Sequence, residues 1–213
     1  MKKIYFIVVI VLYLALGKIF LKAQDACQNC TGYYPFCYVL EIPTDVCPSN
    51  QPSYVVFCYD IKDCPNQIHI GIVYMEIDPS CFYQIWEFFP NWLRSNIVNL
   101  CGYQPCDEPP PMEIYYTVPI CGSVEWIGAQ RRLIYRNSNN LDCDKSCITK
   151  YLFCIDGFET HWVPVSKTII GIGDCPEIPY GDGTIYPFTT DPTNPNFYWQ
   201  IECTKIIGVN CEL

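Results

Sequence analysis

Sixteen cysteines constrain this chain more than any other feature of its sequence. None of them lies in the first 26 residues, and their number is even. An even number at this density is typical of a disulfide scaffold made for an oxidising compartment. We therefore predict that every cysteine is paired, namely Cys27, Cys30, Cys37, Cys47, Cys58, Cys64, Cys81, Cys101, Cys106, Cys121, Cys143, Cys147, Cys154, Cys175, Cys203 and Cys211.

Two cysteine clusters share almost the same spacing. Residues 27–37 follow C-x2-C-x6-C, residues 143–154 follow C-x3-C-x6-C, and both end in Phe-Cys after an aromatic-rich run. Each cluster predicts a disulfide clamp at the start of a β-strand, with its third cysteine bonded elsewhere. Because Asp-Cys-Pro also occurs twice, at 63–65 and 174–176, we hypothesise that the two halves of the chain are diverged copies.

The spacing does not determine which cysteines pair, because sixteen cysteines allow a very large number of complete pairings. Zinc would require paired C-x2-C knuckles, and only one such motif is present, at residues 27–30. The same motif lacks the preceding strand and following helix of a thioredoxin-like redox centre. We predict structural disulfides, no metal and no cofactor. Short loops make three pairs plausible: Cys58–Cys64, Cys101–Cys106 and Cys203–Cys211.

Residues 1–23 have the pattern of a bacterial secretory signal peptide. Two lysines follow Met1, and thirteen apolar residues run from Ile4 to Leu16. The alternative is a retained membrane anchor over residues 4–21, which Lys18 disfavours. We predict cleavage, secretion and no membrane attachment of the mature chain.

The chain is acidic, with 22 Asp and Glu residues against 13 Lys and Arg residues and a formal net charge of −9. Loss of residues 1–23 would remove four lysines and no acid, which makes the charge still more negative. Such a chain repels phosphate backbones, so we predict no nucleic-acid partner. The one basic cluster, Arg131, Arg132 and Arg136, is interpreted as an exposed strand face that pairs with nearby acids, rather than a nucleic-acid or sulfate site.

Runs rich in Ile, Val and Tyr between Pro, Asn and Asp turns predict strands. The fold class is therefore α+β and β-rich, with small antiparallel sheets, one main helix and disulfides. The first two strands, 33–40 and 53–60, are expected to pair as a hairpin. The other predicted strands are 67–77, 113–121, 131–136, 150–156, 162–172 and 197–201.

The one predicted helix covers about residues 79–101. Asp78 and Pro79 provide an N-cap and a first helical residue, and Gly102 provides the stop. Pro90 predicts either a kink or two short helices that share one apolar face. That face should pack on the sheet, with an exposed partner-binding face as the alternative. It consists of Phe82, Ile85, Trp86, Phe89, Leu93, Ile97 and Leu100.

Three consecutive prolines predict an extended linker at 108–111. This linker would separate a unit at 25–107, with strands and the helix, from a β unit at 112–213. Each unit is small enough that we expect disulfides to supplement its core.

Residues 173–196 are rich in Gly, Pro, Asp and Thr and predict a long surface loop. The acids Asp174, Glu177, Asp182 and Asp191 lack the alternating spacing of an EF-hand, so calcium is disfavoured. Aromatic residues in and around the loop could form a binding surface for sugar or peptide, or could simply belong to a core. The candidate surface consists of Trp162, Tyr180, Tyr186, Tyr198 and Trp199.

No catalytic motif accompanies the two histidines, His69 and His161, and every thiol is expected to be bonded. We therefore predict a secreted, non-enzymatic interaction or structural module at or outside a bacterial cell surface, with a protein or glycan ligand. The alternative is a small secreted hydrolase of glycan or peptide. Its paired carboxylates would leave no local signature in the sequence.

Overall fold

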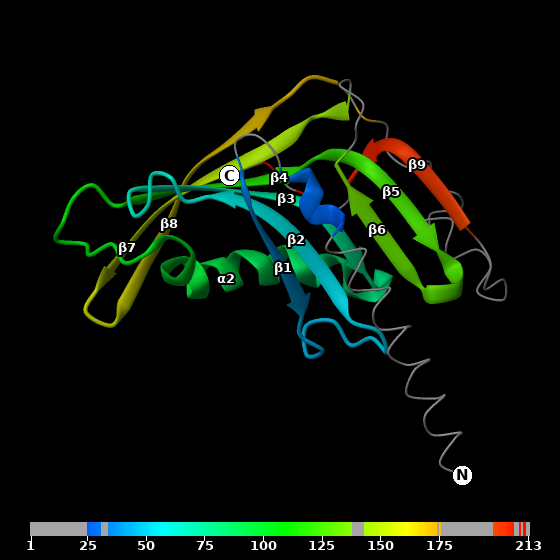
Figure 1. Ribbon diagram of the computed structural model, residues 1–213, viewed down its shortest axis with the longest axis horizontal. Coiled ribbons are helices and arrows are strands. Elements are labelled where there is room, and N and C mark those ends of the chain that lie inside the picture. Colours follow the sequence, from blue (N-terminus) through cyan, green and yellow to red (C-terminus); the bar gives the residue numbers. More distant parts are fainter. Residues whose placement is uncertain are drawn as a thin grey trace, which may run out of the picture.

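The strands of the protein form one sheet with a single long helix against it (Figure 1). This computed structural model describes residues 25–30, 34–137, 143–173, 175, 198–206, 209 and 211. The β-rich α+β fold with disulfides is confirmed. The strands join one mixed nine-stranded sheet, however, rather than several small antiparallel ones.

Each predicted strand and the helix have a counterpart, although many boundaries differ by a few residues. The second and third strands begin and end at the predicted residues, whereas the predicted strand 113–121 is replaced by two strands. In chain order the elements are η1 (Cys27–Asn29), β1 (Phe36–Ile42), β2 (Ser53–Asp60), β3 (Gln67–Ile77), η2 (Pro79–Cys81), α2 (Phe82–Cys101), β4 (Met112–Pro119), β5 (Cys121–Ile127), η3 (Gly128–Gln130), β6 (Arg132–Arg136), β7 (Ser146–Asp156), β8 (Glu159–Ile170) and β9 (Tyr198–Lys205).

Strand β3 connects the parts of the sheet. One edge pairs antiparallel with β2, which in turn pairs with β1 as the predicted hairpin. The other edge pairs in parallel with β4 over 67–71 and antiparallel with β6 over 74–77. Beyond β3 the sheet therefore has two arms, β4–β7–β8 and β6–β5–β9. In Figure 1 the turn of the β7–β8 hairpin and the β5–β6–β9 arm lie on opposite sides of the molecule.

Both predicted units contribute strands to this sheet, because β3 belongs to 25–107 and its neighbours β4 and β6 belong to 112–213. The division at 108–111 stays a prediction. The duplication hypothesis is contradicted, because the two cysteine clusters are not equivalent. β1 of the first cluster pairs with β2, whereas β7 of the second lies between β4 and β8.

All sixteen cysteines are paired, as predicted, but the three short-loop pairs are wrong. Each cysteine of those predicted pairs instead bonds to a cysteine that is distant in sequence and that strand pairing or helix packing brings close. The first cluster also departs from prediction, since its third cysteine bonds within the cluster. The bonds are Cys27–Cys37, Cys30–Cys58, Cys47–Cys81, Cys64–Cys101, Cys106–Cys154, Cys121–Cys175, Cys143–Cys203 and Cys147–Cys211.

Helix α2 covers one face of the sheet and buries four of the predicted apolar side chains, while Trp86 and Leu100 are partly buried. Ile85, Phe89, Leu93 and Ile97 are all fully buried. The ring of Phe89 lies 5.2 Å from that of Phe57 in β2 and 5.4 Å from that of Tyr116 in β4. The helix is continuous through Pro90, so the alternative of two short helices is excluded. The predicted apolar face of α2 therefore packs against the sheet and forms part of the main core.

Gly102 ends the helix as predicted, whereas α2 begins at Phe82 with Cys81 as its N-cap, after a separate turn η2 at Pro79–Cys81. The Asp78 carboxylate accepts a hydrogen bond from the Ser80 N–H at 2.9 Å, which caps the η2 turn before α2. Gly102, with φ of 92°, ends the helix and donates its N–H to the Val98 carbonyl. Disulfides Cys47–Cys81 and Cys64–Cys101 additionally tie the two ends of α2 to the loops that follow β1 and β2.

The other face of the sheet is covered over only part of its area. Ala26 and the nearby Cys27 and Cys30 pack on a small second core that includes Val56 and Ile134. This core lies over β2, β3 and β6. The β4–β7 side of the same face has no comparable buried cluster among the described residues. The small disulfide-rich cluster near Ile120 includes Cys147, which pairs in register with Val118 of the main core.

Candidate functional site

Five polar and aromatic side chains share the face of β3, β4 and β7 that points away from α2. Side chains alternate between the faces of a strand. Because Ile68, Ile70, Ile114 and Tyr116 are buried towards α2, their neighbours in sequence point the other way. We call this group the open face: Gln67, His69, Glu113, Tyr115 and Lys150, all of them half-buried.

Hydrogen bonds hold the centre of the open face in one arrangement. Lys150 Nζ donates to Glu113 Oε1 at 2.6 Å, and the Tyr115 hydroxyl donates to Glu113 Oε2 at 2.6 Å. Lys150 Nζ also lies 5.3 Å from the centre of the Tyr115 ring. Both oxygens of the carboxylate are therefore occupied, and one cation, one anion and one ring form a nearly neutral group.

These contacts shift the ionisation of all three groups. Hydrogen bonds from Lys150 and then Tyr115 lower the pKa of Glu113. The hydrogen bond to Glu113 raises the pKa of Lys150 and that of Tyr115. Near neutral pH the open face thus has a charged Glu–Lys pair and a neutral tyrosine.

His69 extends the group across the parallel β3–β4 pair. Its ring stacks on that of Tyr115, with centres 4.6 Å apart and planes 9° from parallel. Its Nε2 is hydrogen-bonded to Gln67 Nε2, and the Tyr34 ring lies 6.3 Å away. Burial lowers the pKa of His69, only partly offset by Asp60 and Asp63, so the imidazole is neutral at neutral pH. The histidine lies in a strand, as expected from the sequence.

An apolar groove of about 500 Å³ adjoins the open face. Leu152, which forms part of its wall, pairs in register with Glu113. The other walls come from the Cys106–Cys154 disulfide, Pro111 and Val163. The open face and the groove together offer charged groups, ring edges and an apolar recess in one continuous region.

The predicted aromatic surface falls in several places. The Trp162 ring packs 4.6 Å from Tyr151 and 6.1 Å from Phe153, on the side of the main core. Tyr198 is 55% exposed and lies in β9. Strands β8 and β9, which hold Trp162 and Tyr198, are at opposite ends of the sheet order. Trp199 pairs through its backbone with Trp126, and Tyr180 and Tyr186 lie outside the described residues.

The other sequence candidates are distributed as follows. His161 lies in the groove wall, next to Val163. The acids considered for calcium, Asp174, Glu177, Asp182 and Asp191, all lie outside the described residues. In the part of the chain that the structure describes, no group of three His, Cys, Asp or Glu side chains could hold a metal ion. No helix in that part is long and apolar enough to cross a membrane.

Sequence reasoning did not find the open face, although part of it is visible in retrospect. Gln67 and His69 alternate with isoleucines in β3, and Glu113 and Tyr115 alternate with Ile114 and Tyr116 in β4. Alternation of this kind indicates a strand with one solvated face. Nothing in the sequence indicates that β4 lies between β3 and β7, and that placement brings the five side chains together.

Comparison of the chain with protein-family models, with curated proteins and with solved structures found no match in any of the three. The disulfides of the protein do indicate a broad class, that of proteins from an oxidising environment. Eight disulfides and no free cysteine indicate a protein of an extracellular, oxidising environment.

Proposed function

We propose that the protein is an exported, non-enzymatic interaction module that binds a protein or glycan ligand through its open face, at or outside a bacterial cell surface. The observation that carries this proposal is the pre-arranged Glu113–Tyr115–Lys150 group beside an apolar groove. Polar side chains that are already fixed lose little conformational freedom when a ligand binds.

The chemistry of the region fits either ligand class. The edges of the Tyr115 and His69 rings and the half-exposed Glu113 and Lys150 offer hydrogen bonds to sugar hydroxyls or to a peptide backbone. The groove provides apolar area for a side chain or a sugar ring. Dense disulfides keep such a surface intact outside the cell.

The test is binding of the oxidised mature protein to glycan and protein arrays. Tyr115→Ala and Lys150→Ala should each reduce binding at least about tenfold, the equivalent of one or two charge-assisted contacts. Tyr103→Ala is the matched control, because Tyr103 is 53% exposed in the loop after α2 and should bind like the wild type. Melting curves of all three variants establish that they fold.

Two outcomes would contradict the proposal. Unchanged binding by Tyr115→Ala with loss of binding by Trp162→Ala or Trp199→Ala would move the site to the predicted aromatic surface. Cleavage of a glycan or peptide, abolished when one acid is changed to its amide, would favour the hydrolase alternative. Among the described residues of this region, Asp156 in the groove wall and Glu113 on the open face are the carboxylates to change, since a glycosidase mechanism uses two.

A further inference from the structure

A second concave region lies at one end of the sheet, apart from the open face. The loop after β1, the junction of β3 with η2 and the turn from η3 to β6 meet there around about 380 Å³ of open volume. We call it the loop cavity. Its walls are mostly polar and include Ser49, Gln51, Asp78, Ser80, Gln130 and Arg131.

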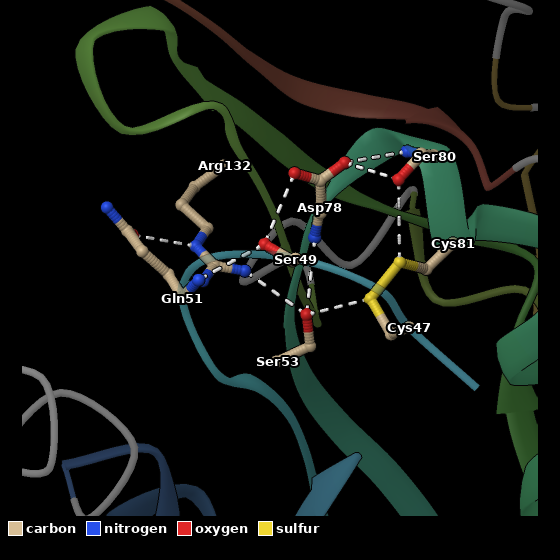
Figure 2. Close-up of a disulfide and its surroundings, with 8 residues drawn as sticks. All are labelled: Cys47, Ser49, Gln51, Ser53, Asp78, Ser80, Cys81 and Arg132. Atoms are coloured by element: carbon tan, nitrogen blue, oxygen red, sulfur yellow. Dashed lines mark hydrogen bonds between the residues drawn. A yellow bond between two sulfur atoms is a disulfide. The ribbon is translucent and has the colours of Figure 1, made fainter. Parts of the chain in front are cut away.

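A buried guanidinium lies directly behind the wall of this cavity, where Arg132 bonds the wall residue Gln51. Arg132 is only 1% exposed, although the sequence predicted an exposed strand face. The prediction is wrong for Arg132, whose side chain is enclosed by the loop after β1, where Nε donates to Gln51 Oε1 at 3.1 Å and Nη1 to Ser53 Oγ at 3.1 Å. It is confirmed for Arg136, which forms an ion pair with Glu125 at 2.8 Å. Figure 2 shows the guanidinium among Ser49, Gln51, Ser53 and Asp78.

One donor of this guanidinium is unused. Nη2 of Arg132 is buried and has no hydrogen-bond partner among the described residues. A buried cation normally has all its N–H groups bonded, since leaving one unpaired costs about 1–3 kcal/mol or more. The hydrogen bonds that are made go to a side-chain amide and a hydroxyl, not to a carboxylate.

The two acids whose charges act on Arg132, Glu76 and Asp78, are already hydrogen-bonded to other groups. Glu76 accepts the Tyr74 hydroxyl at 2.8 Å. Asp78 accepts three hydrogen bonds, from Ser49 Oγ at 3.4 Å, Ser80 N at 2.9 Å and Ser80 Oγ at 2.7 Å. Among the described residues of the cavity wall Asp78 is the only acid, and these donors reduce the negative potential that it presents there.

Arg131 adds a second guanidinium, from an exposed position in the cavity wall. Its φ of 51° is the only positive φ of a non-glycine residue in the described part of the chain. The Arg131 N–H bonds the Gly128 carbonyl at 3.1 Å, which fixes this left-handed turn and therefore the origin of the side chain. Arg131 is thus part of the cavity wall, and the next residue, Arg132, lies behind the wall against Gln51.

We propose that the loop cavity binds a small ligand that carries one oxyanion group, either an inorganic sulfate or phosphate or the carboxylate of an acidic monosaccharide. Guanidinium groups match oxyanions in geometry and charge. The hydroxyls of Ser49 and Ser80 and the amides of Gln51 and Gln130 provide further partners for the rest of the ligand. A polyanion is disfavoured because the whole chain has a formal charge of −9.

The test is equilibrium dialysis of the oxidised protein with labelled sulfate, phosphate and glucuronate, at constant ionic strength, with glucose as the neutral comparison. Saturable uptake of about one equivalent of at least one anion is expected, together with no uptake of glucose. Sulfate or phosphate binding without glucuronate binding identifies an inorganic anion as the ligand, and the reverse identifies an acidic sugar. Absence of saturable uptake of all three anions would overturn the proposal.

Three variants locate the binding. Arg131→Gln should weaken binding about tenfold, and Arg132→Met should weaken it further. Asp78→Asn should strengthen binding severalfold, because it removes the one acid of the wall and asparagine still caps the η2 turn. Arg94→Gln, an exposed arginine of α2 that bonds Thr160, is the control and should bind like the wild type.

Arg132→Met also removes a buried structural contact, so this variant could fail to fold. The Arg131→Gln and Asp78→Asn variants then decide the question, because they change the cavity charge in opposite directions at its surface. Equal affinity of both variants and the wild type would overturn the proposal, since a purely structural Arg132 predicts that result.

Discussion

Tyr115 and Tyr116 are adjacent in β4 and point to opposite faces of the sheet. The Tyr115 hydroxyl is half-exposed and bonded to Glu113, whereas the Tyr116 hydroxyl is fully buried against α2 with no partner among the described residues. Desolvation raises the pKa of Tyr116 well above its ordinary value, while the pKa of Tyr115 is raised mainly by its hydrogen bond. The same residue type is used for packing on one face and for polar contacts on the other.

From this contrast we expect the helix-covered face of the sheet to stabilise the fold and the open face to bind the ligand. The helix-covered face contains the long row of fully buried side chains from α2, β2, β3 and β4. The open face contains few of them, and its contacts are hydrogen bonds between partly solvated groups. Substitutions on the first face should therefore change the free energy of unfolding, and those on the second should change binding.

Disulfide reduction is the change from which we expect the largest loss of stability. Reduction should unfold the protein under conditions where the oxidised form melts cooperatively, which would show that the helix-covered core is insufficient alone. The measurement is a circular-dichroism melting curve with and without excess reductant, and an unchanged curve would contradict the prediction.

Replacing one disulfide at a time measures how much each bond contributes to stability. Replacing Cys64 and Cys101, 37 residues apart at the end of α2, should cost about 2–5 kcal/mol of unfolding free energy. Replacing Cys27 and Cys37, only 10 residues apart on the other face, should cost less because a shorter loop loses less entropy when closed.

A pair of core and surface truncations tests the comparison directly. Phe89→Ala should lower the unfolding free energy by about 3–5 kcal/mol, because the ring is fully buried between Phe57 and Tyr116. Leu152→Ala, on the half-exposed wall of the groove, should cost only about 1 kcal/mol. Urea denaturation of both variants is the measurement, and equal losses would show that the open face is as important for stability as the helix face.

The helix face could be predicted because its pattern is local. Spacings of three and four place Ile85, Phe89, Leu93 and Ile97 on one side of a helix whatever the rest of the chain does. The limits of β2 and β3 were likewise set by nearby prolines and asparagines. Turn residues and periodicity act over a few residues, and these are the elements that the sequence placed correctly.

Features that depend on distant residues could not be predicted in the same way. The strand β5 was missed because the predicted strand 113–121 ends where β5 begins, and no strand was predicted over 122–127. Gly122 is required by packing, since a Cβ atom there would lie 2.7 Å from the Arg136 carbonyl oxygen in β6. Disulfide partners up to 64 residues apart and the burial of Arg132 depend on the same long-range pairing.

The smallest expected effects come from removing the two hydroxyls of β4 separately. Tyr116→Phe should leave stability unchanged or raise it by up to about 1 kcal/mol, because a buried hydroxyl without a partner is lost and the ring stays. Urea denaturation measures this, and a clear loss of stability would mean that the hydroxyl has a partner in solution.

Tyr115→Phe should act on ionisation instead. The variant loses one of the two hydrogen bonds that lower the pKa of Glu113, so this pKa should rise towards its ordinary value of 4.5. A carboxylate with a lowered folded-state pKa stabilises the protein above its unfolded pKa, and this stabilisation is lost as the pH falls through the folded value. Below about pH 4.5 the variant should therefore lose less stability on further acidification than the wild type does. NMR titration of the Glu113 carboxyl carbon measures the pKa, with Tyr103→Phe as the control. An unchanged Glu113 pKa in Tyr115→Phe would show that Lys150 alone holds the carboxylate, and the polar group of the open face would then reduce to a single ion pair.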